Sequence, residues 1–144
     1  MSQILDDRQA PEVRRGALLL RVTLWITLFD LVAFGGAIFL APYFVVEVLG
    51  DSPAFAYFSL RWSGGILLGM GLAVWHLLRK PTGQLPVFTA IATATTLAGI
   101  GKAWSVFGGE YEGPAWWAVM VLLGTLGVGI LQWFARSRSR HLLE

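Results

Sequence analysis

Three ionisable residues, Asp30, Arg61 and Lys102, lie inside long apolar stretches of the sequence. On insertion scales a charge at the centre of a membrane span costs about 2.5–3.5 kcal/mol, so each of these groups needs a partner, water or an interface. One interpretation is structural: the two cations reach the headgroups and Asp30 forms a salt bridge. A second is a polar pocket for an anionic or polar headgroup, and a third is a proton or ion path.

Other residue types offer little chemistry. Cysteine is absent, which excludes disulfides, thiolate metal sites and cysteine nucleophiles. The two histidines match no metal-binding motif, and we expect His76 to be interfacial and His141 to lie in a mobile tail. Threonines recur at helical spacing over residues 89–96, where hydrogen bonds to the backbone or between helices are the expected role. We therefore predict no catalytic residue, no metal and no resident cofactor, and the sequence favours a non-enzymatic protein.

The composition determines which elements must position these residues. The chain has 144 residues, of which 56% are hydrophobic and 14% charged, whereas about a quarter of the residues in a soluble domain are charged. An all-α, integral membrane four-helix bundle in one membrane domain is predicted. Its expected spans are residues 16–40, 58–78, 85–107 and 115–135. Residues 1–15 form a polar lead, the first helix is too long for a signal-peptide core, and a short interfacial helix is plausible at 44–49.

The charges flanking these spans are unevenly distributed. One side holds eight cations, namely Arg8, Arg14, Arg15, Arg79, Lys80, Arg136, Arg138 and Arg140. The loops of the other side, residues 43–57 and 108–114, hold no Lys or Arg and four acids. The positive-inside rule then places both termini in the cytoplasm, and we expect a multi-pass protein of the bacterial inner membrane. The last two residues, Leu143 and Glu144, are open to a second interpretation as a remnant of an expression vector.

Depth along the helices brings the three charges to one level. Asp30 lies 14 residues after Gly16, about 21 Å from the cytoplasmic end, and Lys102 lies 17 residues after Leu85, about 26 Å up. Arg61 lies three residues below the outer end of the second span. A candidate polar pocket in the outer half is therefore predicted, lined by Asp30, Arg61, Lys102, Trp62 and Trp104.

Glycines within the spans predict close helix packing. Gly64, Gly65, Gly69 and Gly124 belong to patterns of small residues that let helix backbones approach one another. Packing within one bundle is the simpler interpretation. A face for a dimer, or for docking onto a larger membrane complex, is the alternative.

Three short motifs resemble those of a known family. An Arg-x-x-Gly-Gly pattern (Arg61, Gly64, Gly65) opens the second span, Gly101-Lys102 comes late in the third, and Gly113-Pro114 precedes the fourth. Over residues 17–135 the chain resembles small bacterial four-helix membrane proteins of the DoxX-like kind, especially an uncharacterised branch. That resemblance implies a four-helix membrane fold and, by analogy with named relatives, partnership with redox complexes. The acid expected early in the fourth span is missing here, so Asp30 or a loop Glu would pair with Arg61 or Lys102.

These patterns lead to three functional hypotheses. The first is a small non-enzymatic accessory or scaffold subunit that packs against a larger membrane complex or against itself. The alternative is a binder of a lipid- or quinone-type molecule in the outer polar pocket, and the third is a small transporter or channel. Membrane lipids are expected partners and nucleic acid is not, because the net charge is only +2.

Overall fold

The computed structural model describes residues 11–43, 54–109 and 115–144, and all regular secondary structure in these ranges is helical. The helices are α1 (Pro11–Leu40), α3 (Ala54–Arg79), α4 (Leu85–Phe107), α5 (Ala115–Arg138) and α6 (Arg140–Leu143). The all-α prediction is confirmed. The predicted third span coincides with α4. Polar residues outside the apolar stretch continue α1 and α5 beyond the predicted spans, and α3 begins four residues before its predicted span, at Ala54, and ends one residue after it. The interfacial helix predicted at 44–49 lies outside the described residues.

Three helical segments are long and apolar enough to cross a membrane: Val13–Leu40, Leu85–Phe107 and Ala118–Arg138. Only 22–33% of the residues in their most apolar windows are buried within the protein, so most of this apolar surface faces outward. The second predicted span, within α3, is not among the three. Arg61, His76 and the glycines between them lower its hydropathy, and the count of four spans remains a prediction.

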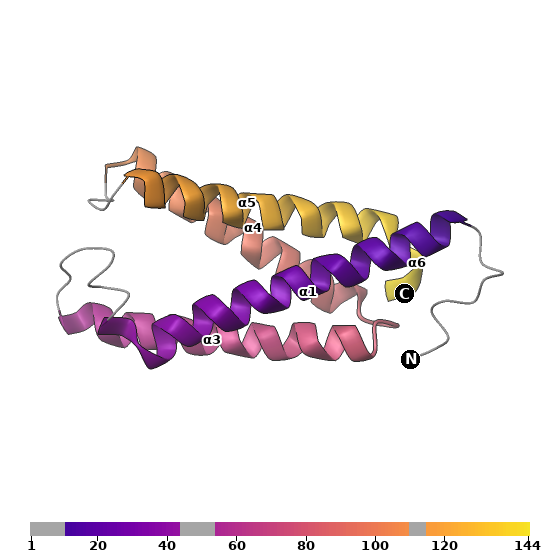
Figure 1. Cartoon of the computed structure of the whole chain (residues 1–144), viewed down its shortest axis with the longest axis horizontal. Helices are drawn as coiled ribbons and strands as arrows, with labels where there is room; N and C mark the ends of the chain where they lie inside the picture. The colour runs from indigo at the N-terminus through magenta and orange to yellow at the C-terminus, as the bar shows by residue number, and fades with distance from the viewer. Residues whose placement is uncertain (1–10, 44–53, 110–114) are drawn as a thin grey trace.

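The four long helices form two antiparallel hairpins, α1 with α3 and α4 with α5 (Figure 1). The two hairpins approach one another at the end where the chain termini lie and diverge toward the opposite end (Figure 1). Contacts between the hairpins run mainly from α1 to α5, while α3 touches α4 much less. The core is therefore concentrated at one end of the molecule, which we call the terminal end.

Two glycines allow α1 and α3 to cross closely. A Cβ atom built on Gly64 would lie 2.8 Å from the Gly35 carbonyl oxygen and from the Phe39 backbone nitrogen, and one built on Gly35 would lie 2.8 Å from Leu67 Cβ. No side chain fits between the backbones at these positions. Gly64 and Gly35 thus lie at the close approach of α3 to α1.

The other predicted packing glycines behave differently. Gly65 lies beside the Phe39 ring, with 3.8 Å from its would-be Cβ to the nearest ring atom, which is an ordinary contact. A Cβ on Gly69 or Gly124 would meet nothing within 4 Å, so neither glycine packs against another helix within the described bundle. The second hairpin instead uses two other glycines, with Gly99 packing against Leu126 and Gly129 against Thr96.

A buried cluster joins the hairpins at the terminal end. Its members come from α1, α3, α4, α5 and α6: Leu20, Leu24, Leu31, Val74, Leu77, Phe88, Ile91, Ala135 and Leu143. Two buried hydrogen bonds cross it: Gln132 Nε2 donates to Thr27 Oγ1 at 3.0 Å, and Ser139 Oγ donates to the Gly16 carbonyl at 2.7 Å. The prediction of a mobile tail is wrong, because residues 139–143 turn back onto α1 and Leu143 is fully buried.

The glycine crossing yields a matched pair of stability predictions. Gly64→Ala should destabilise the protein by about 1–3 kcal/mol, because its methyl group would collide with backbone atoms that cannot move aside. Gly69→Ala should instead be neutral or stabilising by up to about 1 kcal/mol, since its methyl group meets open space and alanine favours the helix. Unfolding in mixed detergent micelles, followed by circular dichroism, measures both. Equal effects of the two substitutions would contradict the close crossing.

Candidate functional site

Lys102 is the charged side chain that α4 directs toward the other helices. Its Nζ atom donates a hydrogen bond of 2.8 Å to Thr125 Oγ1 on α5, and the Thr125 hydroxyl in turn donates to the Val121 carbonyl at 2.8 Å. The same Nζ atom lies 5.6 Å from the centroid of the Phe34 ring on α1, in a cation–π contact. Lys102 therefore connects three helices near the diverging end.

Asp30 lies one helical turn before Phe34 on α1, and its carboxylate attracts the Lys102 ammonium electrostatically. The two groups form no direct ion pair. An ammonium group has three N–H donors, and within the described part of the chain only Thr125 accepts one of them. The arrangement is thus an exposed carboxylate and a half-buried ammonium that attract each other without a direct bond, and the ammonium keeps N–H donors that no described residue accepts. We call Asp30, Phe34, Lys102 and Thr125 the outer polar cluster.

Chemically, the outer polar cluster can hold a polar group between the carboxylate and the ammonium. Charged groups of this kind within membrane helices face a bundle interior or a water-filled space, and they mark binding or transport pathways more often than random positions do. The neighbouring Phe34 ring gives this region an apolar wall. The cluster offers recognition of a polar headgroup or a carbonyl.

The other residues of the predicted pocket lie elsewhere. Arg61 and Trp62 are exposed on α3 and line a separate shallow groove of about 500 Å³ together with Phe39, Gly65 and Ile66. Trp104 projects outward from α4 and is 74% exposed. The structure therefore brings Asp30 and Lys102 together and leaves Arg61, Trp62 and Trp104 on outward faces, so the five residues do not line one cavity.

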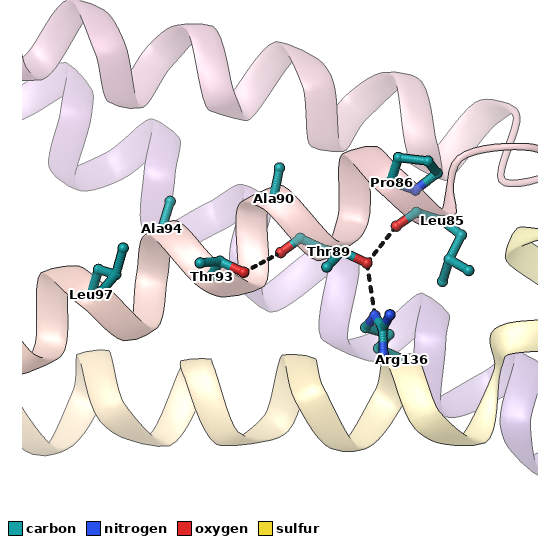
Figure 2. A pocket seen from close by; sticks show the side chains of 8 residues that line it. All are labelled: Leu85, Pro86, Thr89, Ala90, Thr93, Ala94, Leu97 and Arg136. Carbon is teal, nitrogen blue, oxygen red and sulfur yellow. Dashed lines mark hydrogen bonds between the residues drawn. The ribbon is translucent and has the colours of Figure 1, made fainter.

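A second groove lies at the terminal end, along α4 beside α5 (Figure 2). It has a volume of about 680 Å³ and is lined by Leu85, Pro86, Thr89, Ala90, Thr93, Ala94, Leu97 and Arg136. Arg136 Nε donates to Thr89 Oγ1 at 2.7 Å, and the guanidinium carbon lies 5.2 Å from the centroid of the Trp133 ring. We call this feature the Arg136 groove.

The helical threonines confirm the expectation of backbone and interhelical hydrogen bonds. Thr89, Thr93 and Thr96 each donate to the carbonyl four residues earlier, over 2.7–2.9 Å. Thr89 also accepts from Arg136, and Thr96 accepts from Trp133 Nε1 at 3.1 Å.

Several residues of these sites were missed by sequence reasoning. Thr125 and Phe34 carry no signal of their own, because threonine and phenylalanine are ordinary residues of a span. Gln132 carries one: an amide within the apolar stretch of a span must find a hydrogen-bond partner, although the sequence alone does not identify that partner as Thr27. Arg136 was counted among the cations that set the topology, and its proximity to Thr89 follows only from the antiparallel pairing of α4 and α5.

Comparison with known proteins adds no relative. No family model, no curated protein and no solved structure matches the chain. The resemblance to DoxX-like proteins accordingly stays a prediction.

Proposed function

We propose that this chain is a small integral membrane subunit without catalytic activity, which packs through α5 against a larger membrane complex or a second copy of itself. The proposal includes four spans with both termini in the cytoplasm of a bacterial inner-membrane protein. It is also the role that the DoxX-like resemblance implies. One feature of the structure carries the proposal: the outward face of α5.

The outward face of α5 has the form of a helix–helix contact surface without a neighbour. Two glycines, Gly124 and Gly127, are exposed, and a Cβ atom on either would meet nothing within 4 Å. Large exposed apolar side chains surround them at helical spacing: Met120, Leu123, Ile130 and Phe134. No charged residue occurs between Ala115 and Ala135, so this face suits a partner inside the membrane. Helices in lipid associate through such small residues flanked by larger ones.

Substitution on this face should disrupt assembly. Gly127→Leu fills the groove between the large side chains, and we expect about tenfold weaker association from the resulting steric conflict. Energy transfer between labelled copies in liposomes measures self-association, and a photo-crosslinker at position 127 in native membranes captures a different subunit. Gly36→Leu, at a glycine of α1 that also meets open space, is the matched control. Crosslinks to neither a second copy nor another subunit would refute the proposal.

The proposed topology can be tested because the chain contains no native cysteine. Thr82→Cys, in the turn between α3 and α4, should react with a membrane-impermeant maleimide only after the cells are opened. Glu112→Cys, between α4 and α5, should react in intact spheroplasts. The expected direction follows from the excess of Arg and Lys on the side of Thr82. The reverse labelling pattern, or labelling of both positions from one side, would rule out the proposed orientation.

A second candidate function is supported by the outer polar cluster. The ammonium of Lys102, bonded to Thr125, and the carboxylate of Asp30, exposed on α1, are the polar groups with which a quinone carbonyl or a lipid headgroup would form hydrogen bonds. Lys102 is expected to add little to the stability of the bundle, since replacing a charged group inside a protein with an apolar side chain often leaves the free energy of unfolding unchanged. A binding role gives the lysine a purpose that stability does not.

Lys102→Met should therefore lower the amount of quinone or lipid that co-purifies with the protein by about tenfold, because one charged hydrogen-bond donor is lost. Mass spectrometry of extracts from purified protein measures the bound molecules. Arg61→Met, on an exposed face away from the cluster, should leave them unchanged. An unchanged extract from Lys102→Met would show that the cluster is purely structural.

A further inference from the structure

The Arg136 groove differs from the α5 face and from the outer polar cluster in both its place and its chemistry. It begins at the first turn of α4, at Leu85 and Pro86, and follows the helix to Leu97 (Figure 2). Twelve residues of helix correspond to about 18 Å. One leaflet of a bilayer has about 15 Å of hydrocarbon, half of the roughly 30 Å core, so the groove is about as long as an acyl chain.

The lining of the groove is apolar except at one end. Three small side chains, Pro86, Ala90 and Ala94, recur every four residues and make one side of α4 narrow. The hydroxyl protons of Thr89 and Thr93 are donated within the helix, to the carbonyls of Leu85 and Thr89. Neither threonine therefore offers a free donor to a ligand, and the groove suits a hydrocarbon chain.

Arg136 is the polar group at the terminal end of the groove. Its Nε atom is held by Thr89 Oγ1 and its guanidinium plane lies near Trp133, so the side chain is fixed at the mouth of the groove (Figure 2). No acidic side chain of the described residues pairs with it, and its two Nη groups retain their donors. A fixed guanidinium with two parallel N–H donors matches a phosphate group.

The surroundings of Arg136 favour an anion as well. Leu85, at the start of α4, is a groove residue, and Gln84 before it makes no side-chain cap, so the first backbone N–H groups of the helix have no capping side chain. Arg79 and Lys80 belong to the same terminal end. Glu144, the acid nearest in sequence, is engaged with Arg140 at 2.6 Å.

We infer that the Arg136 groove binds an anionic phospholipid, whose phosphate pairs with the Arg136 guanidinium and whose acyl chain lies along α4 from Leu85 to Leu97. The lipid belongs to the leaflet on the side of the chain termini. This site shares no lining residue with the α5 face or with the outer polar cluster, so the lipid-binding proposal is tested separately from the proposed function.

The test places the full chain in nanodiscs of phosphatidylcholine into which phosphatidylglycerol is titrated. Native mass spectrometry then identifies the lipids that stay bound to the protein after the protein is released from the nanodisc. The protein should retain phosphatidylglycerol in preference to phosphatidylcholine. Arg136→Gln should weaken retention about tenfold, because a charged hydrogen-bond pair is lost. Arg138→Gln is the matched control, since Arg138 is an exposed arginine outside the groove that lies over Phe134. Inorganic phosphate added in excess should not displace the lipid, because it has no chain to fill the groove.

A second pair of variants tests the apolar part of the site and covers the case in which Arg136→Gln does not fold. Ala90→Leu fills the groove from an exposed position and should weaken retention, whereas Ala98→Leu adds the same volume to α4 beyond the groove and should not. Equal retention of the two lipids by the unmodified chain would overturn the inference. Equal losses in Arg136→Gln and Arg138→Gln, equal losses in Ala90→Leu and Ala98→Leu, or displacement by phosphate alone would overturn it too.

Discussion

The hydrogen bond between Gln132 and Thr27 is the interaction on which the union of the two hairpins depends most. Within lipid, apolar side chains gain little from facing one another rather than the acyl chains, so helices are held by close packing and by polar contacts. This bond is fully buried and links α5 to α1 across the core, at 3.0 Å. Separating the hairpins would leave the Gln132 amide nitrogen without its acceptor, whereas Gln132 Oε1 has no hydrogen-bond partner among the described residues even in the folded bundle.

Because this link lies toward the terminal end, the two ends of the molecule have different properties. Toward the termini, the hairpins share a buried core and leave one long groove on the outside of α4. Toward the other end the hairpins diverge, and the flexible side chain of Lys102 reaches from α4 to α5 and α1. A lysine is well suited to this position, since its four-carbon stem carries the charge across a distance that a shorter side chain would not cover.

Sequence reasoning succeeded where one-dimensional information is sufficient. Apolar length placed α4 at its observed bounds, and the backbone approach at Gly64 followed from the small-residue pattern. Depth also placed Asp30 and Lys102 at a shared level, and the structure brings them into electrostatic contact. The depth of a residue along a helix does not determine on which side of that helix its side chain lies. Arg61 has a similar depth but lies on the outward side of α3, and Gly69 and Gly124 follow the small-residue pattern without facing a neighbouring helix.

The tail shows a second limit of the same kind. The composition of residues 136–144 is that of a basic surface segment, and nothing local predicts that Leu143 enters the core. Its burial depends on the geometry of the whole bundle, because the segment returns to α1 only after α5 has brought it to the terminal end.

The contact between Ser139 and Gly16 also has a consequence for the order in which the protein assembles. The two residues are 123 positions apart, so the partner of the first helix is synthesised long after that helix. The α1–α3 hairpin can close while α5 is still being synthesised, and its glycine crossing needs nothing from the later residues. Union of the hairpins has to wait for Gln132, Ser139 and Leu143 to emerge. During that interval the exposed side of the first hairpin is covered by lipid or by whatever insertion machinery holds it.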